Sequence, residues 1–275
     1  MGIQPSLLIL AAALACTGRD STATSAIAQI AICEDENEWP PYVYRQRGAD
    51  GASGKLTGYA VDVISEILKQ HGIRVSFELI PWPRCQAVAA LGQQFQMVLN
   101  LSYNEERMRN FLMTRAYYST TTYYYYSRRH YPKGPPVHSP ADLRRHRVCG
   151  IHGYNYVNYG LPAGTVDQGA RDFESLIAKL HASRCVLFLE KHEVMAGFAA
   201  IGKNYLADRD LVGAPMPGMP KTAFYMGVSR RYKHAHELRA LVDDALLKMQ
   251  ENGRLAEIWR RYAKSPPANM PGGLL

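Results

Sequence analysis

The sequence contains no long run of basic residues. Its 32 Lys and Arg residues are scattered, in places as short pairs such as Arg128-Arg129 and Arg144-Arg145. We therefore expect no nucleic-acid partner, because nucleic-acid-binding domains gather positive charge in a patch or stripe. The formal net charge of +8 indicates instead a general affinity for anions, including acidic ligands.

Several motifs of enzymes and metal sites are also absent. There is no Gly-x-Ser-x-Gly elbow and no phosphate-binding glycine loop. His192-Glu193 is not followed by the second His, at position 196, that a zinc protease helix needs. No two cysteines have the Cys-x-x-Cys spacing of zinc or thioredoxin-like sites. These absences favour a binding protein, with no metal and no cofactor, over an enzyme.

Long apolar runs are scarce. Ser6 to Ala15 has the length of the apolar part of a secretory signal and is short for a membrane span, and no other run is long enough for one. Ala26-Ile27-Ala28 provides an A-x-A cleavage site. We predict a signal peptide over residues 1–28 and a periplasmic location. Cys16 offers an alternative, since Ala13-Leu14-Ala15-Cys16 loosely resembles a lipoprotein cleavage site.

Beyond Cys16, the chain contains an even number of cysteines, and in an exported protein this favours disulfides. Buried free thiols are the alternative, and the sequence allows three connectivities. The four residues are Cys33, Cys85, Cys149 and Cys185.

Patterns of strand and helix alternate after the predicted leader. Apolar or alternating runs predict strands at 30–33, 73–80 and 97–99, and apolar spacing predicts helices over 59–71 and 83–91. Gly48 to Gly58 is glycine-rich and polar, so we expect a loop or a turn there. This alternation is typical of an α/β unit with a parallel sheet.

A second unit of the same kind follows. Ser139-Pro140 opens a short helix, strands are predicted at 147–151 and 185–189, and helices are predicted to begin at 153–159 and to span 173–181. Extended segments at 117–127 and 222–228 flank this unit, and a helix with apolar residues from 238 to 249 closes the chain.

The predicted fold class is therefore α/β with two lobes joined by two extended crossings. Lobe 1 comprises residues 29–122 and 226–265, lobe 2 comprises residues 123–225, and residues 266–275 form a flexible tail. This architecture places a ligand cleft between the lobes and closes around its ligand by hinge bending.

Five stretches, in order, resemble a known family. They are Trp39-Pro40-Pro41-Tyr42, Gly58-Tyr59-Ala60-Val61-Asp62, Ser102 to Arg107 with Phe111 and Tyr117-Tyr118, Leu143 to Gly153, and Gly253 to Trp259. Together they resemble the periplasmic solute-binding proteins of family 3, the polar amino-acid receptors of ABC importers. The resemblance extends from Ile30 to Ala263. The family usually has Asp where this chain has Gln96 and Val186, so the resemblance does not identify a particular ligand.

The resemblance implies that Arg107 binds a ligand carboxylate. The planar guanidinium suits this role, because it offers two parallel N–H donors to a carboxylate. Asn100 and Ser102, two residues apart on a strand, are expected on the same side as each other. The alternative for Arg107 is a surface residue in a solvated helical turn.

Further residues are expected at the cleft of lobe 1. Trp39, Tyr42 and Trp82 would enclose an apolar or cationic part of the ligand, although aromatic residues are as often core. Arg84 would be a second anion contact or merely the polar side of a helix.

In lobe 2, Tyr154 and Asn155 lie at a predicted strand-to-helix turn whose N–H groups suit a carboxylate, and helix capping by Asn is the alternative. Glu190, at the end of a predicted strand, would meet a ligand ammonium or be an exposed loop residue. The expected element positions favour the disulfides Cys33–Cys85 and Cys149–Cys185, one in each lobe.

The sequence thus predicts a periplasmic, monomeric protein that captures a small, amino-acid-like carboxylate for an inner-membrane ABC permease. One alternative is a sensory or cofactor-associated binding protein. Another is a dehydratase-like enzyme, which would need paired acids in the cleft, and Glu36 with Glu190 is the pair considered.

Overall fold

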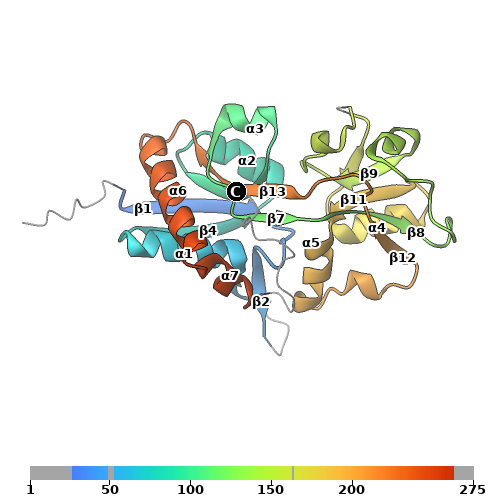
Figure 1. Ribbon diagram of the computed structural model, residues 1–275, viewed down its shortest axis with the longest axis horizontal. Coiled ribbons are helices and arrows are strands. Elements are labelled where there is room, and N and C mark those ends of the chain that lie inside the picture. Colours follow the sequence, from blue (N-terminus) through green and yellow to red (C-terminus); the bar gives the residue numbers. More distant parts are fainter. Residues whose placement is uncertain (1–26, 49–52, 163, 263–275) are drawn as a thin grey trace, which may run out of the picture.

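The computed structural model describes residues 27–48, 53–162 and 164–262, and its strands form two large sheets, one in each of two lobes (Figure 1). The sheet of lobe 1 has the order β4-β1-β5-β13-β6, with β7 also paired to β13. Its strands are β1 (Gln29–Asp35), β4 (Arg74–Ile80), β5 (Met97–Ser102), β6 (Phe111–Met113), β7 (Tyr118–Thr120) and β13 (Thr222–Ser229). The strands β4, β1 and β5 run parallel, and β13 is antiparallel to its neighbours.

The helices of lobe 1 are α1 (Tyr59–Gln70), α2 (Trp82–Ala90), α3 (Glu105–Asn110), α6 (Ala235–Glu251) and α7 (Arg254–Trp259). The predicted apolar face of α1, which includes Val61, Ile64 and Ile67, is buried. Gly58 precedes α1 with φ +128°, and a Cβ there would lie 2.2 Å from the Tyr42 carbonyl oxygen. Glycine therefore fits the start of α1 against the Trp39–Tyr42 segment.

Lobe 2 is built on a sheet of order β10-β9-β11-β8-β12. Its strands are β8 (Thr122–Ser127), β9 (Val148–Ile151), β10 (Asp167–Ala170), β11 (Leu187–Lys191) and β12 (Leu211–Pro215). Its helices are α4 (Phe173–His181), α5 (His192–Gly197) and the 3₁₀ turns Pro140–Arg145, Val157–Tyr159, Phe198–Ile201 and Tyr205–Ala207. The two sheets confirm the predicted two-lobed α/β fold.

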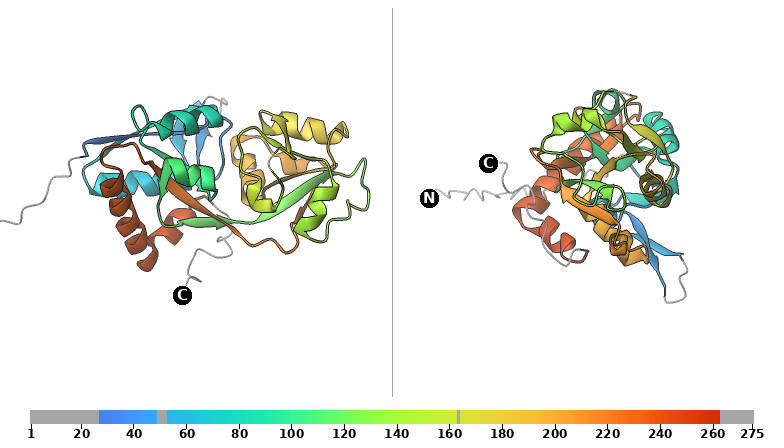
Figure 2. Two further views of the ribbon diagram at one scale, coloured as in Figure 1. Left: turned by 90° about the horizontal axis from the view of Figure 1, so that it is seen from above. Right: turned by 90° about the vertical axis from the view of Figure 1, so that its right-hand side faces the viewer.

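Two crossings connect the lobes (Figure 2). The first runs from β7 to β8 through Thr121, and the second from β12 to β13. The chain rejoins the sheet of lobe 1 at Thr222, four residues before the boundary at 226 given by the sequence, because β13 pairs with β7 from that residue on.

Two local predictions are wrong. The segment 48–58, expected as a loop or a turn, includes the strand β3 (Ser53–Thr57), which pairs with β2 (Tyr44–Arg47) in a hairpin that projects from the body (Figure 2). The helix expected to begin at 153–159 is a turn followed by a single 3₁₀ turn, Val157–Tyr159. The Tyr156 hydroxyl accepts the Ile151 backbone N–H at 2.8 Å, and this contact holds the segment as a compact loop.

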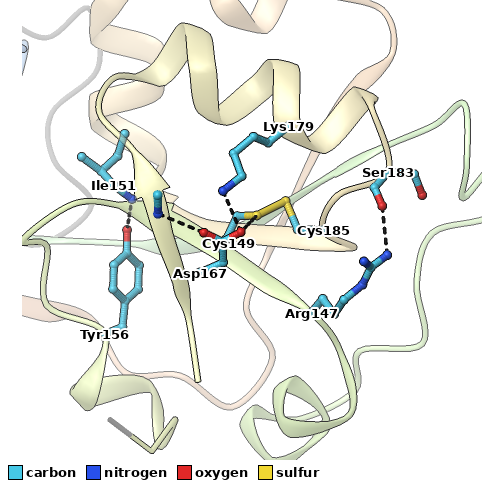
Figure 3. The surroundings of a disulfide bond; sticks show 9 residues. Arg147, Cys149, Ile151, Tyr156, Asp167, Lys179, Ser183 and Cys185 are labelled. Carbon is cyan, nitrogen blue, oxygen red and sulfur yellow. Dashed lines mark hydrogen bonds and ion pairs between the residues drawn. A yellow bond between two sulfur atoms is a disulfide. The ribbon is translucent and has the colours of Figure 1, made fainter. Parts of the chain in front are cut away.

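Both predicted disulfides are present. Cys33 and Cys85 join the first strand of lobe 1 to α2, with Cα atoms 5.6 Å apart. Cys149 and Cys185 join β9 to the residues just before β11, with Cα atoms 5.8 Å apart, beside the Lys179–Asp167 ion pair (Figure 3). Each bond lies within one lobe, so neither crosses the hinge.

Most of the predicted leader, with Cys16, and the whole predicted tail lie outside the described residues. Ile27 is buried in the hydrophobic core, and the Ala28 carbonyl accepts the Arg74 N–H at 3.1 Å. The cleavage site after Ala28 stays a prediction. Among the residues described, no helix is both long and apolar enough to cross a membrane.

Candidate functional site

A cavity of about 60 Å³ lies between the lobes. The carboxyl ends of β1, β5 and β11 supply most of its polar lining, as expected for parallel strands that meet at one edge of a sheet. Lobe 1 contributes Glu34, Asp35, Trp39, Trp82, Asn100, Ser102, Arg107 and Phe224, and lobe 2 contributes Tyr154, Asn155, Tyr156, Tyr159, Leu189, Glu190 and Lys191.

Arg107 is the basic residue that lobe 1 contributes to the lining of the described cavity. Its side chain is only 6% exposed. The Asn104 side chain caps α3 by accepting the Arg107 backbone N–H at 2.7 Å, which fixes where the Arg107 side chain starts. Nη1 donates to the carbonyl and hydroxyl oxygens of Ser102, both at 3.0 Å, and Nε donates to Gln86 at 3.1 Å. The guanidinium lies 5.8 Å from the centre of the Trp82 ring.

These partners of Arg107 are neutral. No carboxylate oxygen within the described segments lies within 4.0 Å of its nitrogens, and Nη2 takes part in none of the contacts above. Burial lowers the pKa of Arg107 to about 10, against the opposing attraction of Glu106 and Glu34. The Arg107 guanidinium is thus buried and charged, and it has no counterion among the described residues. Burying an unpaired charge is costly.

Two acids occupy the end of β1. Glu34 accepts the Leu99 backbone N–H and the Asn100 amide, the latter at 2.8 Å. Burial raises the pKa of Glu34 to about 7, although these hydrogen bonds oppose the rise. Asp35 accepts the Asn37 N–H at 3.0 Å and the Tyr154 hydroxyl at 2.9 Å, and burial raises its pKa to about 6.

Two oppositely charged residues that are adjacent in the sequence, Glu190 and Lys191, end β11. The Glu190 carboxylate accepts the backbone N–H of Lys191 at 2.7 Å through Oε1. Burial raises the pKa of Glu190 to about 7, a rise that the nearby Lys191 ammonium reduces but does not cancel. The Lys191 ammonium donates to the hydroxyls of Thr122, Tyr159 and Thr222 at 2.9, 2.6 and 2.9 Å, so it touches both crossings between the lobes.

Aromatic rings form the apolar part of the lining. Trp39 packs on Phe224 with ring centres 4.9 Å apart, and Trp82 lies beside Arg107. The Trp39 Nε1 N–H is buried and has no hydrogen-bond partner within the part of the chain that the structure describes. A ligand acceptor that reached this N–H would remove the cost of leaving it unpaired.

Direct hydrogen bonds connect the lobes at the rim of the cavity. The Asn155 amide of lobe 2 donates to the Ser102 hydroxyl at 3.0 Å and to the Tyr103 carbonyl at 2.9 Å, and the Tyr154 hydroxyl donates to Asp35. Because the same Ser102 hydroxyl accepts from Arg107, the contact between the lobes and the position of the guanidinium share one group.

The structure brings eight of the ten sequence-predicted ligand residues to this cavity, namely Trp39, Trp82, Asn100, Ser102, Arg107, Tyr154, Asn155 and Glu190. It does not bring Tyr42 or Arg84 there. Tyr42 is fully buried and stacks on Tyr118 with ring centres 4.1 Å apart. Arg84 is exposed on α2, which corresponds to the alternative given for it. The part of these residues in binding stays a prediction.

Sequence reasoning missed seven lining residues: Glu34, Asp35, Tyr156, Tyr159, Leu189, Lys191 and Phe224. It considered Glu36 instead, and Glu36 is exposed. Glu34 and Asp35 directly follow the predicted first strand, so their place at a strand's carboxyl end was a usable signal. Lys191 follows Glu190 in the same way.

Two α/β lobes with a charged cavity between them define a two-lobed binding protein. The chain belongs to the bacterial extracellular solute-binding proteins of family 3, whose family model matches residues 31–265. The L-cystine-binding protein TcyA of Bacillus subtilis (strain 168) is 22% identical over 231 residues, which are 82% of this chain and 78% of that protein.

Solved structures show the same fold. One is the substrate-binding protein of an ABC uptake transporter from Streptococcus pneumoniae with bound histidine, with a TM-score of 0.67 and 16% identity over 88% of this chain and 95% of that one. Another is a histidine kinase sensor domain with similarity to periplasmic binding proteins, with a TM-score of 0.67 and 20% identity over 86% of this chain and 97% of that one.

Proposed function

We propose that this protein captures a small, amino-acid-like ligand through its free carboxylate and delivers it to an inner-membrane ABC permease, acting as a periplasmic monomer. The observation that carries the proposal is the buried Arg107 guanidinium, which is held in place by neutral groups and has no carboxylate partner in the described chain. A ligand carboxylate would supply the missing counterion with the planar geometry that arginine favours.

The opposite wall suits the amino group of the same ligand. Glu190 is buried, and its Oε1 accepts the Lys191 N–H, while no N–H or O–H of the described residues donates to its Oε2. A ligand ammonium beside Glu190 would stabilise the ionised carboxylate, whose pKa burial has raised. Trp39, Trp82 and Phe224 would cover the rest of the ligand. The named ligands of the two relatives, L-cystine and histidine, support this proposal because both carry a carboxylate and an amino group.

The test is a thermal-shift screen of amino acids, dicarboxylates and opines, followed by calorimetry on any ligand that stabilises the protein. Arg107→Ala is expected to weaken binding at least about 30-fold, because it removes one side of a buried charge pair. Arg107→Lys keeps the charge without the fork and should fall between the two. Arg109→Ala, an exposed position on the same helix, is the control and should bind like the wild type.

The proposed role of Arg107 fails if no carboxylate stabilises the wild type, or if Arg107→Ala responds to ligand as the wild type does. Transport is tested separately, by asking whether the liganded protein stimulates the ATPase of a cognate permease.

A sensory role is a second candidate, and the likeness to a histidine kinase sensor domain favours it. A protein that binds its ligand but stimulates no permease, and is retained instead by a kinase or dehydrogenase, would support that role. The dehydratase-like alternative has buried acids, Glu34 and Glu190, in the cavity. Recovery of the ligand chemically unchanged after prolonged incubation would exclude it.

A further inference from the structure

The cavity holds five buried charged side chains that form no ion pairs with one another. They are the acids Glu34, Asp35 and Glu190 and the bases Arg107 and Lys191, each less than a tenth exposed. Among the described residues, none of the five has an oppositely charged side-chain partner with N···O within 4.0 Å. Buried charges are usually paired. The unpaired charges of this cavity therefore suit a ligand that brings charged groups of its own.

Neutral groups hold each of these side chains in place. Glu34 is held by a backbone N–H and the Asn100 amide, and Asp35 by a backbone N–H and the Tyr154 hydroxyl. Such donors fix the direction of a carboxylate without cancelling its charge. The geometry is therefore preorganised, while the electrostatic demand for ligand charge remains.

The two bases differ in what they can still accept. The Lys191 ammonium has three N–H donors, and the hydroxyls of Thr122, Tyr159 and Thr222 occupy all three. Arg107 has Nη2 outside its contacts with Ser102 and Gln86. The cavity therefore offers one anion-binding fork, on lobe 1, and no second one equally ready for a ligand carboxylate.

The acids outnumber the bases by three to two. When all three acids are ionised, the cavity carries an excess of one negative charge, and a ligand with one carboxylate and one ammonium, which is neutral overall, would leave that excess unchanged. We propose that the ligand is a basic amino acid, with one carboxylate and two cationic groups, and that Glu34 and Asp35 receive its second cation. This inference rests on the proposed function, since it places the carboxylate at Arg107.

The surroundings of the two acids suit a cationic side chain. Trp39 and Phe224 line the same cavity as Glu34 and Asp35, and aromatic faces attract cations, most strongly when both are removed from water. The apolar stem of a long basic side chain would lie on these rings, while its charged end meets the carboxylates. Burial raises the pKa of both acids, which supports the view that they lack a countercharge.

The experiment compares ligands of matched shape by isothermal titration calorimetry of the whole protein. Arginine is paired with citrulline and lysine with norleucine, because each pair differs chiefly in the side-chain charge. We expect at least one basic member to bind about tenfold or more tightly than its neutral partner. Glutamate is included as the ligand with a second carboxylate.

Three variants locate the effect. Glu34→Gln and Asp35→Asn should each reduce the preference for the charged member of the pair, with a smaller effect on the neutral member. Glu36→Gln, an exposed neighbour on the same segment, should leave the preference unchanged.

Tighter or equal binding of citrulline and norleucine, or tightest binding of glutamate, would overturn this inference and leave the proposed function standing. Binding of no carboxylate at all would instead overturn the proposed function. Because the comparison of paired ligands is made on the wild type, it decides the matter even if a variant folds poorly.

Discussion

Glu34 combines burial, hydrogen bonds from neutral donors and a position in the ligand cavity. Its pKa is raised from 4.5 to about 7 in the folded protein, so the folded state binds more protons than the unfolded state between these values. Linkage then requires the free energy of unfolding to fall as the pH rises from about 4.5 to about 7.

We expect Glu34→Gln to remove this part of the pH dependence, because an amide does not titrate. Between pH 5 and pH 8, the free energy of unfolding should fall by roughly 1 to 3 kcal/mol less in the variant than in the wild type. Chemical unfolding of the ligand-free wild type and variant at several pH values measures it. Asp35, Glu190 and Lys191 remain in both proteins, so an unchanged slope would mean that Glu34 is not a source of the dependence.

Tyr42 gives a second prediction for a single residue. Its side chain is fully buried, and its hydroxyl has no hydrogen-bond partner within the described segments. Because an unsatisfied buried hydroxyl is unfavourable, Tyr42→Phe should leave stability unchanged or increase it by about 1 kcal/mol. Ligand affinity should not change, since Tyr42 packs in the core rather than at the cavity. Weaker ligand binding in this variant would instead support the sequence-based prediction that Tyr42 contacts the ligand.

At the scale of elements, each disulfide closes a long loop inside one lobe. The cysteines are 52 residues apart in lobe 1 and 36 apart in lobe 2. Replacing either pair by alanine should lower the free energy of unfolding by up to about 4 kcal/mol, from the loop-closure entropy of the unfolded chain. Affinity should be retained, because neither bond crosses the hinge. A loss of affinity at unchanged stability would contradict this.

The main elements could be predicted from the sequence because their signals are local. The apolar spacing of Val61, Ile64 and Ile67 is enough for α1, and its buried face is the predicted one. The 153–159 segment shows why other elements could not be predicted. Tyr156 lies against Gly150, where a Cβ would come within 2.3 Å of its ring, and it bonds to Ile151. These contacts arise only in the folded lobe, so local sequence favoured a helix that does not form.

The candidate site divides in the same way. Arg107 and Ser102 lie in one continuous stretch with a distinctive pattern, and both line the cavity. The choice among Glu34, Asp35 and Glu36 depends on where β1 ends and on the Leu99 N–H of the neighbouring strand that Glu34 reaches. Phe224 reaches the cavity from β13, which begins more than 180 residues after the end of β1. Such long-range placement has no local signature.

At the scale of the whole molecule, Gly197 marks a close approach of the lobes. It lies in α5 of lobe 2, and a Cβ on it would lie 2.4 Å from the Pro40 carbonyl oxygen of lobe 1. Its own backbone is helical, with φ −62°, so alanine there is compatible with lobe 2 itself. Glycine is thus required by the contact between lobes and not by the helix.

Gly197→Ala should therefore weaken ligand binding about tenfold by opposing closure of the lobes, with little change in unfolding temperature. Calorimetry and small-angle X-ray scattering with and without ligand measure the two effects. Ala196→Ser, an exposed neighbour, is the control. Wild-type affinity in Gly197→Ala would show that this approach of the lobes is not needed for binding.

The two disulfides also affect how the chain reaches its native form. Each joins cysteines that are consecutive in the described chain, first Cys33 with Cys85 and then Cys149 with Cys185. In a protein secreted from its N-terminus, Cys33 and Cys85 both emerge before Cys149. An oxidase that links thiols in their order of emergence would thus produce the native bonds directly, and maturation would not depend on a disulfide isomerase to exchange wrong partners.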